Sequence, residues 1–181
     1  MALSRRARWL QAGATGFLVL IPFLVLAALA GLVAYWGFGL AEIDGGPLGD
    51  RFIVLADRPP EPERRLFGLL ACLPALVLQL LGAWSLWRLF AGFRFGALVG
   101  AAAIRHLRSF AGYTALAVLA AFALSGVMRW AAGAFDDAPL WTHLGFSTTH
   151  AAILFMAGLV YMASFIVEEG EEYRRETEDY V

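Results

Sequence analysis

The sequence predicts an all-α integral membrane protein with four transmembrane helices and an interfacial amphipathic helix between spans two and three. Hydrophobic residues make up 60% of the 181 residues and charged residues 16%, more apolar side chain than one soluble domain of this length can bury. The apolar residues gather in four stretches, each long enough to cross about 30 Å of hydrocarbon. We therefore expect a four-helix bundle that forms a single membrane domain over residues 1–181.

The first span is expected at residues 13–36, because no charged residue stands between Arg8 and Glu42. The arginines at the amino terminus, followed by apolar residues, also fit the start of a cleavable secretory signal. The apolar run reaches Trp36, however, whereas the apolar region of a signal peptide is only about 7–15 residues long. We expect this segment to remain in the protein as a span.

Spans two and three are expected at residues 66–87 and 109–129. Pro74 lies inside span two, where it removes one backbone hydrogen bond and should kink the helix. Small residues repeat every four positions in span three, from Ala117 to Ser125. This spacing places them on one face, where they favour close contact with a neighbouring helix in lipid.

The fourth span is expected at residues 144–167, with polar residues at its beginning. Tryptophans lie near the predicted span ends, as in the aromatic belts of membrane proteins. These tryptophans are Trp36, Trp84, Trp87, Trp130 and Trp141. Their positions support the placement of the spans.

Arginine placement predicts the orientation, since cytoplasmic segments of membrane proteins carry an excess of Lys and Arg. With the amino terminus inside, the cytoplasmic side holds nine arginines: Arg5, Arg6, Arg8, Arg88, Arg94, Arg105, Arg108, Arg174 and Arg175. The other side holds five: Arg51, Arg58, Arg64, Arg65 and Arg129. An even number of spans then places both termini in the cytoplasm. All 14 basic residues are arginine, which indicates a GC-rich bacterial genome, so the expected membrane is the bacterial inner membrane.

The external loop is expected at residues 40–65. Glycine- and proline-rich turns flank a short apolar run there, which favours a turn, a strand and a second turn. The six carboxylates of the loop lack the spacing of a calcium-binding loop. We interpret the segment as a solvated loop.

The cytoplasmic connection is expected at residues 88–108. A helix over residues 97–111 would place Ile104 and Leu107 on one side and Arg105 and Arg108 on another. This pattern is typical of a helix that lies on the membrane surface.

The carboxyl-terminal tail, residues 168–181, is acidic. Glu171 and Arg175 have the i,i+4 spacing and order that support a helix, so span four should project into the cytoplasm. Two interpretations remain open. The tail is either a solvated helix end that pairs with arginines of its own chain, or a docking surface for a basic cytoplasmic partner, since carboxylate clusters orient arginine-rich surfaces.

The residue types that catalysis and cofactor binding require are scarce. His106 is expected at one membrane face and His143 and His150 at the other, so no pair of histidines can hold a haem between the spans. The isolated Cys72 lacks the partners for a thiolate metal site. We therefore expect no enzymatic activity, no cofactor and no metal. A formal charge of −1 also excludes a globally basic protein that binds nucleic acid directly.

Two stretches carry a resemblance to a known family. One runs from residues 86–90 through 95–96 to residues 104–108, an arginine-rich connection that leads into an amphipathic segment. The other is the acidic tail that ends on Val181. In these stretches and in its span layout the chain resembles a bacterial family of small four-span membrane proteins known as domain of unknown function family 2975.

The resemblance implies a partner, because members of that family are often encoded beside small helix-turn-helix regulators. A membrane protein of this kind would bind or restrain a small basic cytoplasmic DNA-binding regulator. The candidate partner-binding residues are Glu171, Glu172, Glu176, Glu178 and Asp179, with Arg105 and Arg108 as the surface that positions the tail or contacts anionic lipid.

The sequence thus favours a regulatory or interaction protein that is anchored in the lipid bilayer and assembles with a partner or with further copies of itself. The alternative is a component of a small-molecule transporter or exporter. Transport predicts a polar cavity lined from several spans. Polar residues within or near the spans are few: Gln79, Ser85, Thr114, Ser125 and Ser164.

Overall fold

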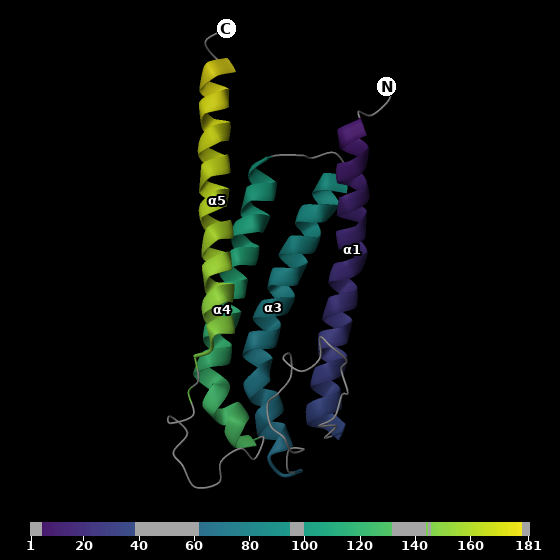
Figure 1. Cartoon of the computed structure of the whole chain (residues 1–181), viewed down its shortest axis with the longest axis vertical. Helices are drawn as coiled ribbons and strands as arrows, with labels where there is room; N and C mark the ends of the chain where they lie inside the picture. Colours follow the sequence, from purple (N-terminus) through teal and green to yellow (C-terminus); the bar gives the residue numbers. More distant parts are fainter. Residues whose placement is uncertain (1–4, 39–61, 95–99, 132–143, 145, 179–181) are drawn as a thin grey trace.

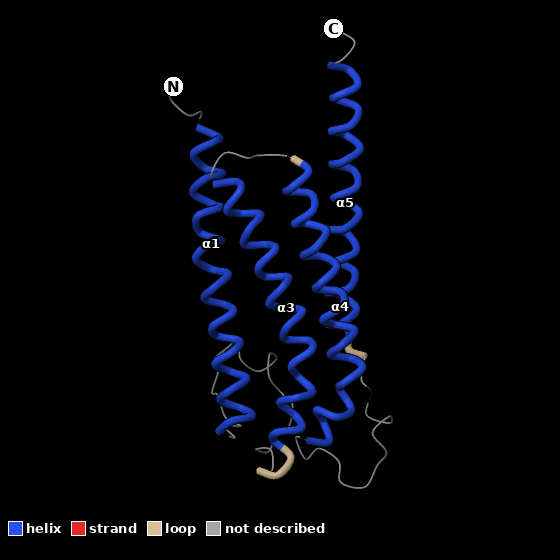
Figure 2. Tube along the Cα trace, turned by 180° about the vertical axis from the view of Figure 1, so that it is seen from behind, coloured by secondary structure: helices blue, strands red, loops and turns tan. Residues whose placement is uncertain are grey.

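The computed structural model describes residues 5–38, 62–94, 100–131, 144 and 146–178. All the secondary structure in these segments is helical (Figure 2). The helices are α1 (Arg5–Leu32), which continues into the π-helical turn η1 (Val33–Gly37), then α3 (Arg65–Arg94), α4 (Ala101–Ala131) and α5 (Thr148–Glu178). The prediction of an all-α fold is confirmed for these described segments. The external loop, residues 40–65, lies almost entirely outside the described residues.

Four helices are long and apolar enough to cross a membrane: Gln11–Gly37, Arg65–Arg94, Ala101–Ala131 and Thr148–Gly170. At 1.5 Å of rise per residue, the shortest of these, with 23 residues, is about 34 Å long, more than the roughly 30 Å of a bilayer core. Each predicted span falls on one of these helices. Pro74 lies within α3 and Pro22 within α1, and both helices continue through them.

The start of α5 differs from the predicted start of span four. The helix begins at Thr148, four residues after Leu144, because Ser147 caps it. The His150 amide donates to Ser147 Oγ at 3.2 Å, and the Ser147 amide donates to His150 Nδ1 at 3.2 Å. This reciprocal pair satisfies amide donors that the first turn of a helix leaves unbonded.

The expected surface helix over residues 97–111 is not a separate element. Residues 101–111 form the first turns of α4, which runs unbroken to Ala131, and residues 95–99 lie outside the described chain. α3 also extends past residue 87 to Arg94. Residues 101–131 contain no proline, so nothing in the backbone chemistry ends the helix where its amphipathic part meets its apolar part.

The four helices form an open row, in the order α1, α3, α4, α5 (Figure 1). Within the described chain α1 contacts α3, α3 contacts α4 and α4 contacts α5, while no contact joins α1 to α4 or α5, or α3 to α5. The predicted bundle is therefore not closed. Both termini lie at one end of the row, which we call the terminal end (Figure 1).

The core lies at the opposite end, where side chains of η1 pack with side chains of α3 and α4. Tyr35, Trp36 and Ala131 are buried there, and Trp130 and Cys72 pack against them. The Trp36 ring occupies the space beside Gly68, where a Cβ atom would overlap it. Glycine at position 68 is thus what allows α1 to approach α3 this closely.

Candidate docking segment and its anchor

The candidate docking segment is residues 171–179, of which residues 171–178 form the acidic end of α5. α5 continues without a break from its apolar part, which ends at Gly170, to Glu178. Figure 1 shows this end of α5 projecting past the terminal ends of α3 and α4. The expectation that span four continues as a helix into the tail is confirmed as far as residue 178.

Arg108 of α4 holds α5 where the projecting segment begins. Its Nε atom donates a hydrogen bond to Ser164 Oγ at 3.0 Å, and its Nη2 atom forms an ion pair with Glu168. Its guanidinium carbon also lies 3.9 Å from the centre of the Phe165 ring. One arginine therefore binds α5 by a hydrogen bond, an ion pair and a cation–π contact, a combination that suits the planar guanidinium group.

Ser164 supplies the acceptor for Arg108 from a fully buried position. Its relative exposure is 0%, and its own hydroxyl donates to the Tyr161 carbonyl at 2.6 Å. With its proton committed to the backbone, the Ser164 oxygen has lone pairs free for the Arg108 donor. The hydroxyl thus joins the backbone of α5 to the side chain of α4.

The position of Arg108 on α4 explains why it meets α5. Ile104 and Ala111 stand four residues before it and three residues after it, and both are buried. Residues at this spacing share one face of a helix, and at Arg108 this face contacts α5. The Arg108 side chain is 24% exposed and Glu168 51%, so the pair lies at the edge of the contact and remains open to screening by salt.

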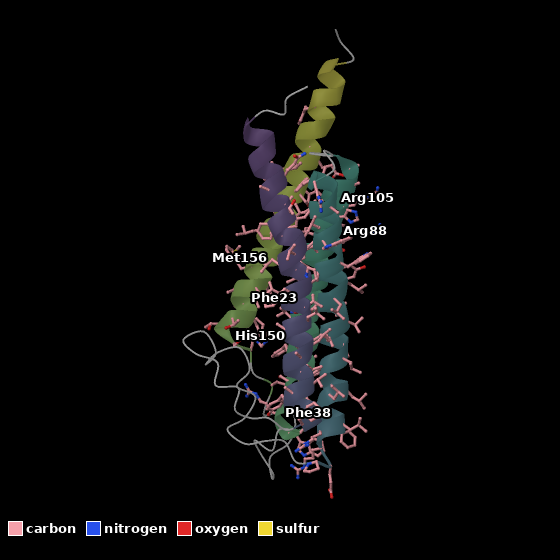
Figure 3. All side chains as sticks on the ribbon, turned by 90° about the vertical axis from the view of Figure 1, so that its right-hand side faces the viewer. Phe23, Phe38, Arg88, Arg105, His150 and Met156 are labelled. Atoms are coloured by element: carbon pink, nitrogen blue, oxygen red, sulfur yellow. The ribbon has the colours of Figure 1, made fainter. Side chains whose placement is uncertain are left out.

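The second predicted arginine lies elsewhere. Arg105 lies about 60° around α4 from Arg108, on the side away from Ile104 and Ala111. It is exposed (Figure 3), and no described residue forms an ion pair with it. Arg108 therefore contacts α5 at Ser164 and Glu168, whereas Arg105 does not contact α5. The two arginines are three residues apart, and the one next to the buried residues of α4, Arg108, is the one that contacts α5.

The predicted carboxylates continue the face that carries Glu168. Residues 171, 172 and 176 follow Glu168 by three, four and eight residues, so these three carboxylate positions stand on the same side of α5, together with position 175, which is an arginine. The structure describes the backbone of residues 171, 172, 176 and 178 as helix and leaves their side chains undescribed. Asp179 lies outside the described residues.

Sequence analysis did not identify Ser164, Phe165 and Glu168 as the contacts of Arg108. One of the two interpretations of the tail, a solvated helix end, expects it to pair with arginines of its own chain, and Arg108–Glu168 is such a pair. Ser164 was noted only as a polar residue within or near the spans. The signal available in the sequence for this contact was a basic residue, Arg108, on the buried face of the amphipathic stretch. The register between α4 and α5 is what pairs these residues, and one sequence does not contain it.

Other candidate groups do not gather into a site. No cluster of three metal-ligating side chains occurs among the described residues. His150 takes part in the cap of α5, and His143 lies outside the described segments. The hydroxyl groups of Ser125 and Ser164 donate to carbonyls one turn back in their own helices, and Gln79 is exposed.

Comparison with known proteins found no match to a family model, to a curated protein or to a solved structure. The function of the chain is therefore argued from the Arg108 anchor, the projecting helix and the distribution of apolar and charged residues.

Proposed function

We propose that the chain is a multi-pass protein of the bacterial inner membrane that presents residues 171–179 of its tail to a small basic cytoplasmic protein. The observation that carries this proposal is the Arg108 anchor. It binds α5 at Ser164, Phe165 and Glu168, directly before the acidic segment. A helix fixed at its root and extended beyond its neighbours can hold carboxylates at a constant height and orientation.

Membrane insertion is supported by the large apolar side chains that the row leaves exposed. Val19 is 68% exposed, Phe23 67% and Ile166 73%. Soluble monomers rarely expose a continuous apolar surface of this kind, whereas lipid tails cover it without cost. α1 and α5, which each contact one neighbouring helix, depend most on that cover.

The cytoplasmic location of the terminal end is supported by charge. This end carries the nine arginines of the predicted inner side. At the opposite end the described chain carries three: Arg64, Arg65 and Arg129. Tryptophan rings also accompany arginines at both ends: the Arg88 guanidinium lies 5.2 Å from the Trp84 ring and that of Arg64 lies 5.1 Å from the Trp130 ring. Trp and Arg prefer the two interfaces of a bilayer.

The partner is inferred from the chemistry of the segment. Residues 171–179 hold five carboxylates against two arginines, a surface that attracts and orients a basic protein. The resemblance to the four-span family suggests a helix-turn-helix regulator, whose arginines would face the carboxylates instead of DNA. The mechanism would be sequestration at the membrane.

The test is a crosslinking pull-down of the full chain from membranes of its native host. The decisive variant changes Glu171, Glu172, Glu176 and Glu178 to Gln, because Gln keeps the helix propensity of Glu and removes its charge. A small basic protein recovered with the wild type and lost with this variant supports docking. Truncation after Gly170, which keeps the Arg108–Glu168 pair, should give the same loss.

Two results would reject the proposal. Recovery of the same partner with the four-glutamine variant shows that the tail carboxylates do not bind it. Recovery of no soluble protein with the wild type, although the protein sits in the membrane, removes the docking function. Glu169→Gln is the matched control and should retain the partner, because it removes one exposed carboxylate of α5 that belongs neither to the Arg108 anchor nor to residues 171–179.

A further inference from the structure

An apolar groove lies between α1 and α3, on the surface of the row. It encloses about 460 Å³ and is lined by Ile21, Pro22, Val25, Leu80, Ala83, Trp84 and Trp87. None of these residues carries a charge. The small side chain of Ala83 leaves room between the helices, and the aromatic rings of Phe17 and Phe90, stacked with centroids 4.5 Å apart, hold α1 against α3 nearer the terminal end.

A basic and aromatic rim borders this groove on its terminal side. Arg88 follows Trp84 by one turn of α3, and its guanidinium carbon lies 5.2 Å from the centre of the Trp84 ring. The Trp84 ring in turn stacks on Trp87, with ring centres 5.4 Å apart. Figure 3 shows Arg88 near the terminal end of the molecule, on the outer side of the helices.

Arg88 has a charge that the described protein does not neutralise. Its side chain is exposed, and no carboxylate of the described segments pairs with it. Arg94, at the end of the same helix, is also exposed. The groove therefore combines an apolar floor with a cationic upper edge.

We propose that this groove binds an anionic phospholipid. One acyl chain lies along Leu80, Ala83 and Val25, and Arg88 donates hydrogen bonds to the phosphodiester. The groove and a phospholipid present their groups in the same order. Along α3 the apolar floor at Leu80 and the charged rim at Arg88 are about 12 Å apart, and in a lipid the acyl chain is likewise followed by the phosphate. The guanidinium fork binds phosphate oxygens in pairs, and the anionic headgroup supplies the missing negative charge.

This inference rests on the membrane insertion proposed above and is independent of partner docking by the tail. The ligand is a membrane lipid and not free phosphate, because the residues that line the groove are apolar. Inorganic phosphate in excess should therefore leave the bound lipid in place, whereas a soluble anion site would lose its ligand.

The experiment reconstitutes the full chain into vesicles of phosphatidylglycerol and phosphatidylcholine, extracts it in mild detergent and measures retained lipids by mass spectrometry. The wild type should retain phosphatidylglycerol in excess over its share of the vesicle. Arg88→Gln should lower that enrichment roughly fivefold, as expected for one basic contact at the membrane surface. Ala83→Phe, which fills the groove, should also lower it while Arg88 stays in place.

Arg129→Gln is the matched control, since it removes an exposed arginine at the opposite end of the row. It should leave the enrichment unchanged, and circular dichroism should show the same helix content for all variants. A wild type without enrichment overturns the proposal, provided that the protein is shown to be inserted in the vesicles. Equal losses with Arg88→Gln and Arg129→Gln would also overturn it, because they would indicate attraction of anionic lipid to the whole surface.

Discussion

α1 and α5 occupy equivalent places at the two edges of the row, yet they are attached in different ways. α1 is attached by shape, through the Trp36 ring in the space beside Gly68 and the stacked rings of Phe17 and Phe90. α5 is attached at its terminal end by charge and hydrogen bonds, through Arg108. Charge screening by salt does not weaken apolar contacts, whereas it weakens a half-exposed ion pair.

This difference matters for function because of where each attachment lies. The Trp36 contact is at the end far from the termini, where it ties η1 to α3 and α4. The Arg108 contact is at the end that projects the acidic segment. We call α1 the fixed edge of the row and the terminal end of α5, next to the surface that we propose for docking, the adjustable edge, because only the latter is held by an ion pair that salt can screen.

The largest expected effect comes from the fixed edge. Trp36→Ala should lower the free energy of unfolding by about 3–5 kcal/mol, because it empties a position that is 2% exposed and packed on three helical segments. Denaturant titration of the protein in detergent measures this loss. Phe23→Ala on the same helix is the control: that ring is 67% exposed, so its removal should change little.

The second effect tests the partner of Trp36. Gly68→Ala should destabilise the protein by about 1–3 kcal/mol, because the new Cβ overlaps the Trp36 ring. Gly92→Ala in the same helix meets open space and should be neutral or slightly stabilising. In a Trp36→Ala background Gly68→Ala should cost much less. Additive losses in the double variant would show that the two positions do not contact each other.

These contacts also show what one sequence can and cannot predict. The four apolar helices and the helical tail follow from composition and periodicity, which are local properties. The open row does not follow from these properties, because it depends on which pairs of helices are in contact. Nothing in the sequence indicates that Gly68 lies against the Trp36 ring. The surface helix over 97–111 was placed by its amphipathic pattern, but an amphipathic stretch and the apolar stretch after it can share one helix, as they do in α4.

The candidate site likewise has a part that the sequence predicts and a part that it does not. The acidic segment is visible in the sequence as a run of carboxylates. Arg108 contacts α5 at Ser164 and Glu168, and its role in positioning the tail stays a prediction. Arg105 fits the same amphipathic pattern but does not contact α5, so for this residue the other expected role, contact with anionic lipid, stays a prediction. Ser164 and Phe165 become identifiable once α4 and α5 are placed side by side.

The adjustable edge gives the third effect. Arg108→Gln should destabilise the protein by about 1–2 kcal/mol, since it removes an ion pair and a cation–π contact and weakens the bond to buried Ser164. Spin labels at positions 102 and 170, in a Cys72→Ala background, should report a broader distance distribution between α4 and α5. Arg105→Gln is the control and should leave the distribution narrow. A narrow distribution for Arg108→Gln would show that apolar contacts alone fix the end of α5.

The smallest effect separates charge from hydrogen bonding within the anchor. Glu168→Gln should cost no more than about 1 kcal/mol, because Glu168 is 51% exposed and water screens the pair. The stability lost in Glu168→Gln should shrink as salt rises to about 1 M, where the Debye length falls to about 3 Å. The stability lost in Arg108→Gln should persist in part, because this substitution also removes the contacts with Ser164 and Phe165. If both losses vanished together in high salt, the anchor would consist of the ion pair alone. If neither changed, the contact with Ser164 would hold α5, and the adjustable edge would be as fixed as the edge formed by α1.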